Sequence, residues 1–189
     1  MSEVSAHDGG LLLAEPALSW SAIFAGAVVA LATSLFLTLL AAGFGYALTA
    51  GGLSTRQSLI AFTPTLGAGA IAIQVVSAGL GGYLAGRLRH PWFSAHTDEA
   101  HFRDTAQGLV TWAIATVAGV ALVALVIAPY AAQLTAGTAM TADMTRASRN
   151  LVQAAFFAAI GMVLSAFTAA VAARVGGLRT EEMHAKGRD

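Results

Sequence analysis

The chain alternates between long apolar stretches and short polar segments. Four of the apolar stretches contain no Asp, Glu, Lys or Arg, and they cover residues 20–53, 57–86, 105–142 and 150–173. Each stretch is longer than the roughly 20 apolar residues that a helix needs to cross a bilayer core. The pattern therefore predicts an all-α membrane bundle of four transmembrane helices. Their spans are expected at about 20–48, 58–86, 109–132 and 150–175.

The predicted spans divide the chain into three parts. Residues 1–18 form an acidic N-terminal tail, residues 19–177 form the transmembrane domain, and residues 178–189 form a charged C-terminal tail. The first apolar run is far longer than the roughly 7 to 15 residues of a signal-peptide core. We therefore expect the first helix to remain in the mature protein.

Two interpretations are open for the start of the second helix. Ser54 to Gln57 fit a capping box, which predicts a helix that begins at Thr55 and is kinked at Pro64. Alternatively, Thr63 caps a new helix whose first residue is Pro64.

The ends of the third and fourth helices carry their own signals. Thr97 is expected to cap the third helix, and Pro129 is expected to bend or end it. The consecutive glycines Gly176 and Gly177 predict the end of the fourth helix.

The positively charged residues predict the orientation of the bundle. With four spans, seven Lys and Arg residues lie on the side of the two termini and the middle loop, and three lie on the opposite side. Because cytoplasmic loops carry an excess of Lys and Arg, both termini are expected in the cytoplasm.

Composition narrows the possible partners. Only 11% of the residues are charged, mean hydropathy is +0.70, and alanine and glycine make up a third of the chain. This composition is typical of closely packed membrane helices, so the expected partners are the lipid bilayer and other membrane helices. A formal net charge of zero provides no basic field for nucleic acid, and the absence of cysteine excludes disulfides and thiolate metal sites.

The two halves of the chain resemble each other in places. Trp20 and Trp112 each open an apolar helix, and residues 86–89 resemble residues 176–179 at a spacing of 90. Two helix pairs in the same orientation would form a parallel repeat. The alternative is that alanine-rich helices resemble one another through composition alone.

The middle of each predicted span contains no ionisable side chain. Proton-coupled transporters usually need such a group within the membrane, and a haem held in a bundle usually needs axial His or Met ligands. We therefore expect no catalytic residue and no cofactor.

Two rows of small residues at four-residue spacing predict helix-packing faces, because small side chains let helix backbones approach closely in lipid. The rows are Ala70, Gln74, Ala78, Gly82 and Gly86 in the second helix, and Gly161, Ser165, Ala169 and Ala173 in the fourth. An amide in hydrocarbon is costly unless it is paired, so Gln74 is expected to bond to another helix. The alternative is that the rows line a pore.

The segment before the third helix has the highest density of polar residues. His96, Asp98, His101 and Asp104 are of metal-ligand type and are the candidates for a metal site, although the zincin spacing His-Glu-x-x-His is absent. We expect a cytoplasmic docking surface here instead of a metal site. Its residues are His96, Asp98, Glu99, His101, Phe102 and Arg103.

Four short motifs add a resemblance to these patterns. They are Trp-Ser-Ala-Ile-Phe-Ala-Gly-Ala at 20–27, Gly-Gly-Tyr-Leu-Ala-Gly-Arg at 81–87, His-Thr-Asp-Glu at 96–99 and Phe-Arg-Asp-Thr-Ala-Gln-Gly at 102–108. With them the chain resembles an uncharacterised family of small bacterial multi-span inner-membrane proteins, some of which carry the label PhnA-like. The resemblance implies a multi-pass protein of the bacterial inner membrane. It implies no chemistry and supplies no site.

These observations favour a non-enzymatic membrane protein that packs through its small-residue faces. It would act as a homo-oligomer or as an accessory subunit of a larger membrane complex. The alternative is a small homo-oligomeric channel or facilitator lined by Thr, Ser and Gln74. An enzyme whose active site is limited to the segment before the third helix is the third possibility.

Overall fold

The computed structural model describes residues 18–49, 64–89, 97–136 and 144–186, and this part of the chain contains helices and no strand. The helices are α1 (Trp20–Thr49), α3 (Pro64–Arg87), α4 (Thr97–Ala136) and α5 (Met144–Lys186). All four are long and apolar enough to cross a membrane. The predicted all-α fold with four membrane-spanning helices is confirmed.

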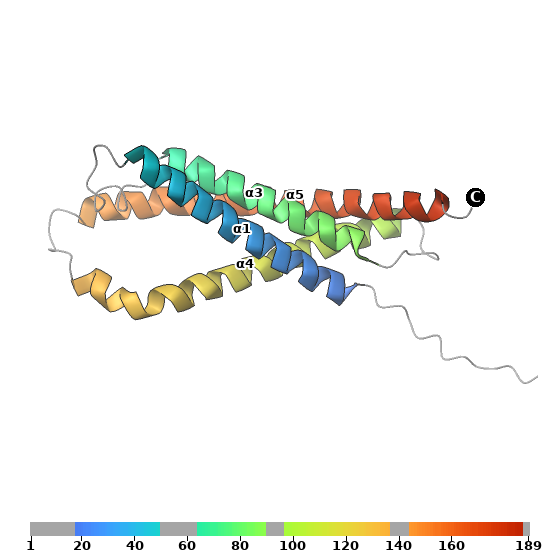
Figure 1. The fold of residues 1–189 in the computed structure, drawn as a ribbon, viewed down its shortest axis with the longest axis horizontal. Helices are drawn as coiled ribbons and strands as arrows, with labels where there is room; N and C mark the ends of the chain where they lie inside the picture. The colour runs from blue at the N-terminus through green and yellow to red at the C-terminus, as the bar shows by residue number, and fades with distance from the viewer. Residues whose placement is uncertain (1–17, 50–63, 90–96, 137–143, 187–189) are drawn as a thin grey trace, which may run out of the picture.

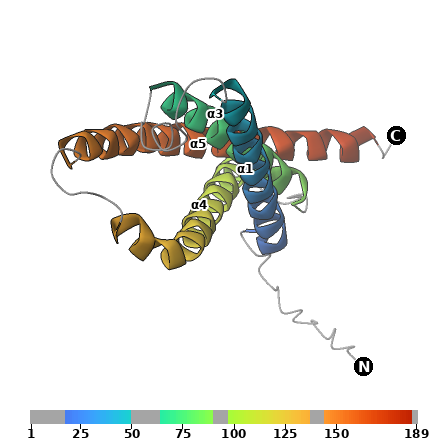
Figure 2. The same cartoon turned by 60° about the vertical axis from the view of Figure 1, so that its left-hand side comes forward.

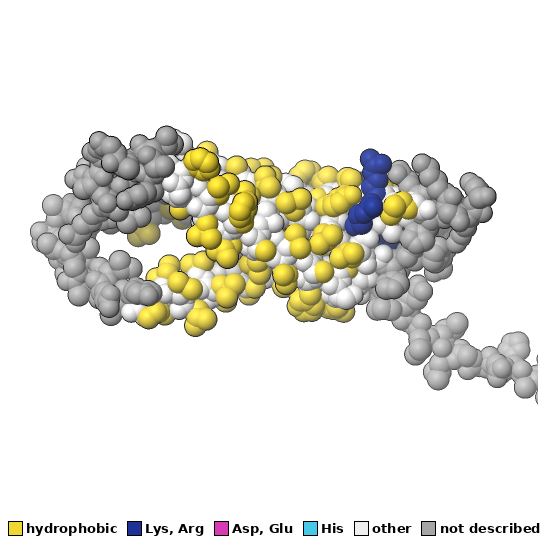
Figure 3. Space-filling model, in the orientation of Figure 1, with side chains coloured by type: hydrophobic (Ala, Val, Ile, Leu, Met, Phe, Trp, Pro, Cys, Tyr) yellow, Lys and Arg dark blue, Asp and Glu magenta, His cyan; other side chains and the backbone are white. Residues whose placement is uncertain are grey.

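The four helices meet at one end of the molecule, and α4 separates from α5 toward the other end (Figures 1 and 2). α3 and α5 stay packed from the Gly67–Phe157 contact to the Gly86–Ala173 contact. The start of α1, the end of α3 and the start of α4 lie together against α5, and we call this region the closed end. Toward its C-terminus α4 diverges from α5 and bends (Figure 1). The described surface is apolar along the helices, with basic side chains near the closed end (Figure 3).

The diverging parts of the helices have few protein neighbours. Every residue of α1 from 38 to 45 and every residue of α4 from 120 to 129 is exposed, as are nearly all residues of α5 from 151 to 160. We call these three segments together the open half. Since most of their side chains are apolar, the open half must be covered by lipid or by other membrane helices.

At the closed end the helices approach each other through small residues. A Cβ atom added at Gly82 would lie 2.8 Å from the Cα of Ala169, and one added at Gly86 would lie 2.9 Å from the Cα of Ala173. Real Cβ atoms essentially never come this close to another heavy atom. Glycine at these two positions therefore sets the close contact between α3 and α5.

The helix pairs α1–α3 and α4–α5 cross in the same way. Gly26 of α1 lies against Gly81 and Ala85 of α3, and Gly108 of α4 lies against Ala169 and Ala173 of α5. In each pair a glycine of the first helix thus meets two small residues that are four positions apart on the second. These contacts match Gly26 with Gly108 at a spacing of 82, whereas the sequence resemblance has a spacing of 90, so the parallel repeat stays a prediction.

Two predicted helix boundaries can be compared with the structure. Within the described residues α3 begins at Pro64, as the second interpretation of this region has it, while the capping box falls in 50–63, outside the described residues. Pro129 lies inside α4, which continues to Ala136.

The predicted end of the fourth helix at Gly176 and Gly177 is wrong. α5 continues through both glycines to Lys186, so most of the predicted C-terminal tail is helical. No described glycine adopts a positive φ, and these two serve close packing instead of chain reversal. A Cβ atom added at Gly176 would lie 3.0 Å from the backbone nitrogen of Arg87.

Candidate functional site

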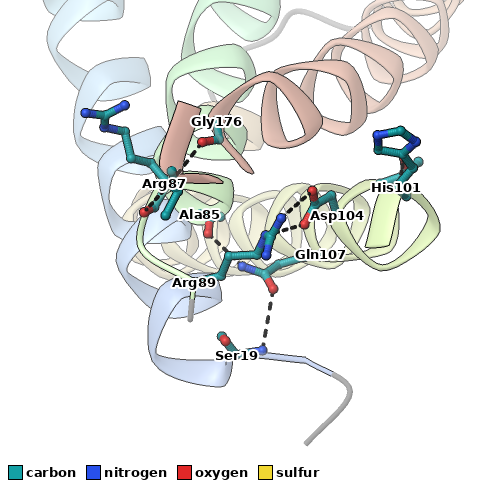
Figure 4. A network of polar contacts seen from close by, with 10 residues as sticks. Ser19, Ala85, Arg87, Arg89, His101, Asp104, Gln107 and Gly176 are labelled. Carbon is teal, nitrogen blue, oxygen red and sulfur yellow. Dashed lines mark hydrogen bonds and ion pairs between the residues drawn. The ribbon is translucent and has the colours of Figure 1, made fainter. Parts of the chain in front are cut away.

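A buried ion pair lies at the closed end of the bundle (Figure 4). Arg89 follows the last turn of α3, and Asp104 lies in the second turn of α4. The Arg89 Nη2 atom donates a hydrogen bond of 2.9 Å to Asp104 Oδ2, and Arg89 Nε pairs with Oδ1. Arg89 is 3% exposed and Asp104 is 1% exposed. The pair therefore joins the end of α3 to the start of α4 out of contact with water.

The Gln107 amide extends this contact to a third segment. Its Nε2 atom donates a hydrogen bond of 2.6 Å to the carbonyl oxygen of Ala85, and its Oε1 atom accepts one of 3.5 Å from the backbone N–H of Ser19 (Figure 4). Gln107 lies three residues after Asp104, so both side chains lie on the same face of α4. We call Arg89, Asp104 and Gln107 the closed-end cluster.

α5 covers the closed-end cluster through a glycine. A Cβ atom added at Gly177 would lie 2.8 Å from Arg89 Nη2 and closer still to Asp104 Oδ2. With Arg89 bound to both carboxylate oxygens and α5 directly above them, Asp104 has no room for a metal ion or a substrate. The arrangement can hold helices in place, and it offers no reactive group.

The structure separates Asp104 from the polar residues before it. Arg103 Nη2 lies 2.5 Å from Glu99 Oε1 in an exposed ion pair one helical turn apart, and Phe102 is 74% exposed. His101 is half-buried, with its Nδ1 atom 3.4 Å from Nη2 of Arg174 on α5.

The candidate metal residues are only partly described. His96 lies outside the described residues, and the side chain of Asp98 is not described. Among the described residues, no group of three His, Cys, Asp or Glu side chains could hold a metal ion. Since Asp104 turns inward to Arg89, it does not belong with His101 to one solvent-facing set.

The predicted packing rows lie largely at the α3–α5 interface. In addition to the Gly82–Ala169 and Gly86–Ala173 contacts, Ala78 and Ser165 are buried.

Ala70 is the exception, because it is exposed. Residues spaced four apart advance by about 40° around a helix at each step, since a turn takes 3.6 residues. The row therefore rotates away from the interface, and Gly67, which lies against Phe157 of α5, provides the contact at that level.

Gln74 lies beside α5 without the predicted hydrogen bond. Its side-chain oxygen lies close to Gly161, where an added Cβ atom would be 3.4 Å from the amide carbon. Among the described residues no hydrogen bond joins this amide to another helix, so its pairing stays a prediction. The absence of a side chain at Gly161 gives the amide its space.

The Gln74 amide faces a cavity of about 450 Å³ between the two helix pairs. Ser77 of α3, Trp112 of α4 and Ser165 of α5 also line it, and the indole Nε1 of Trp112 donates a hydrogen bond of 2.9 Å to Ser165 Oγ. Among the described residues that line the cavity, none carries a charged side chain. Thr111, the first residue of α4 in the lining, lies seven residues after Asp104, so the cavity begins about 10 Å from the ion pair along α4.

Sequence reasoning missed the roles of Arg89, Gln107 and Ser77. Arg89 and Asp104 are opposite charges near the facing ends of two helices, and this signal could have suggested a pair. Gln107 precedes the predicted span 109–132, and nothing in the sequence indicates that its amide bonds to another helix. Nothing in the sequence around Ser77 distinguishes its hydroxyl from that of any other serine in a membrane helix.

Comparison of the chain with protein-family models, with curated proteins and with solved structures gives no match. The resemblance to an uncharacterised family of bacterial inner-membrane proteins stays a prediction. In the structure, the closed-end cluster holds the helices together at one end of the bundle. At the other end α4 diverges from α5.

Proposed function

We propose that the protein is a non-enzymatic subunit of a membrane assembly, in which its open half binds the helices of another chain. The other chain is a second copy of this protein or a larger membrane partner. One observation carries the proposal: ten consecutive residues of α4, 120–129, are exposed on all sides of the helix although four helices are available to pack together.

The open half has the residues that helix association in lipid requires. Ala121, Ala124 and Ala128 of α4 are exposed, and an added Cβ atom at Gly43 or Gly45 of α1 would meet no atom within 4 Å. Helices associate in a bilayer through close packing of small residues, since lipid tails are as apolar as leucine. A partner helix could thus approach α1 and α4 closely.

The contacts at the closed end support the same proposal. The closed-end cluster and the Gly82–Ala169 and Gly86–Ala173 contacts hold α3, α4 and α5 together at one level. α4 can then diverge without separating from the bundle. Helices that are held together at one end and exposed in the open half suit a subunit that binds the helices of another chain.

The location and orientation are part of the proposal. We propose the bacterial inner membrane, as the resemblance implies, with both termini in the cytoplasm. The basic residues Arg87, Arg89, Arg174 and Arg179 lie toward the closed end, which fits a cytoplasmic side rich in Lys and Arg. A reporter that is active only in the periplasm should be silent after Asp189 and active near Gly137.

Photo-crosslinking in the native host tests the proposal. A photoreactive amino acid at Val123, which lines the cavity side of α4, should form a crosslink to a single protein species. The matched control is Leu125, which lies two residues further on the opposite side of the helix and is also exposed. A product at twice the chain mass identifies a homo-oligomer, and a product with another protein identifies an accessory subunit. Crosslinks to lipid alone, or equal protein products at both positions, would contradict the proposal.

A channel or facilitator is the second candidate, and the cavity favours it. Its lining includes the Gln74 amide and the Ser77 hydroxyl, which could contact a polar solute. Within one chain, however, the closed-end cluster and its glycine contacts block any path from the cavity to the closed end. A channel would therefore need several copies, so a symmetric ring of crosslinked copies from Val123 would favour it.

A further inference from the structure

The cavity between the helix pairs contains a hydroxyl group that has no partner. Ser77 is 4% exposed, and its Oγ atom makes no hydrogen bond in the described part of the chain. A buried hydroxyl without a partner is unfavourable and is rare in native proteins. Since Ser77 lines the cavity, a molecule bound there could supply the missing partner.

The α4–α5 pair contains a corresponding serine whose hydroxyl has a hydrogen-bond partner. Ser77, Gly81 and Ala85 of α3 correspond to Ser165, Ala169 and Ala173 of α5, because each serine precedes the two small residues that a glycine of the neighbouring helix contacts. The hydroxyl of Ser165 accepts a hydrogen bond from the indole of Trp112. The same hydroxyl donates a hydrogen bond of 3.1 Å to the carbonyl oxygen of Met162, so in the α4–α5 pair an aromatic ring with a polar atom supplies one of the two partners of the serine.

The first helix pair lacks this ring. Trp112 follows the contact glycine Gly108 by four residues, and the residue that follows Gly26 by four is Ala30. Ala30 lines the cavity beside Ser77. An alanine in place of a tryptophan thus leaves both empty space and an unpartnered hydroxyl on the same side of the bundle.

We propose that the cavity binds a neutral, membrane-soluble ring compound that carries a carbonyl or hydroxyl group. The ring takes the place that an indole would occupy over Ala30. A hydroxyl on the ring would donate to Ser77 Oγ, as the Trp112 indole does to Ser165 Oγ, and a carbonyl would accept from the Ser77 hydroxyl. We take the ligand to be neutral because none of the described residues that line the cavity is charged. A volume of about 450 Å³ lies within the range of ordinary small-molecule sites.

Two further features of the cavity fit this ligand. The Gln74 amide, which has no hydrogen bond to another helix, offers a second polar contact at the cavity wall. The exposed residues Val123 and Ala124 also line the cavity, so it continues into the open half. An apolar tail attached to the ring could leave through this opening into the bilayer. The proposal does not depend on assembly with another chain.

Quenching of Trp112 fluorescence by a decyl-substituted benzoquinone tests the proposal. The full chain is reconstituted in nanodiscs of phosphatidylethanolamine and phosphatidylglycerol, with Trp20→Phe and Trp92→Phe so that Trp112 is the only reporter. Quenching should saturate with quinone concentration. In a second protein that retains only Trp20, which lies outside the cavity, quenching should rise linearly, because the quinone then meets the tryptophan only by diffusion in lipid.

Three variants of the Trp112 protein locate the site. Ser77→Ala should raise the Kd by roughly threefold to tenfold, as expected for the loss of one neutral hydrogen bond. Thr168→Val is the matched control: it removes a hydroxyl that is bonded to Leu164 and does not line the cavity, so the Kd should not change. Ala124→Phe, at an exposed position of the cavity wall, should weaken binding by obstruction.

Linear quenching of Trp112 in the otherwise unaltered chain would overturn the proposal and would indicate a cavity filled by water or lipid tails. An unchanged Kd in both Ser77→Ala and Ala124→Phe would also overturn it. Because Ala124 is exposed, Ala124→Phe keeps the test valid even if Ser77→Ala lowers the melting temperature.

Discussion

At the scale of single residues, Arg89 and Asp104 form an ion pair that is buried from water. Two charges are removed from water, and their attraction compensates for the lost hydration only while both are present. Asp104→Ala should therefore destabilise the protein by about 3–5 kcal/mol, because it leaves the guanidinium buried and unpaired. Thermal unfolding in mild detergent measures the effect.

The exposed pair between Glu99 and Arg103 provides the matched control on the same helix. Glu99→Ala should lower stability by less than about 1 kcal/mol, because water already screens this pair. The double variant Arg89→Met with Asp104→Leu should be more stable than Asp104→Ala alone, since no buried charge remains. Equal melting temperatures for Asp104→Ala and Glu99→Ala would show that the buried pair does not hold the closed end.

At the scale of helices, glycine determines how closely α3 and α5 approach. A methyl group at Gly86 would meet the backbone of Ala173, which cannot move aside as a flexible side chain can. Gly86→Ala should therefore separate the two helices and cost about 1–3 kcal/mol of stability. Gly69→Ala on the same helix is the control, because its Cβ would meet no atom within 4 Å. If the two variants unfold at the same temperature, α3 and α5 are not in the close contact described above.

The four helices could be predicted from the sequence, but their ends and contacts only in part. Charge-free stretches determine the spans because the bilayer excludes charge over a fixed thickness. Gly176 and Gly177 do not end α5, because glycine in a membrane helix also permits close packing. The burial of Asp104 could be predicted only in part, because its charge opposite to that of Arg89 suggests a pair, while nothing in the sequence shows that α5 covers it.

At the scale of the whole molecule, the closed end and the open half should differ in rigidity. Segments with few buried contacts open or shift at low cost in free energy, whereas well-packed ones move only with the whole fold. α4 is fixed to α3 and α5 by the closed-end cluster and by Gly108, and it has no such contact between residues 120 and 129. Motion of α4 relative to α5 should therefore be concentrated in the open half.

Distances between pairs of spin labels measure this difference directly, and the chain has no cysteine to interfere with labelling. Labels at Leu109→Cys and Val171→Cys, both exposed positions near the closed end, should give a narrow distance distribution. Labels at Leu125→Cys and Val152→Cys in the open half should give a broad one in detergent. In native membranes a bound partner would hold α4 in one place, so the open-half distribution should become narrow while the closed-end distribution stays the same. Two equally narrow distributions in detergent would mean that α4 is rigid along its whole length and needs no partner to hold it.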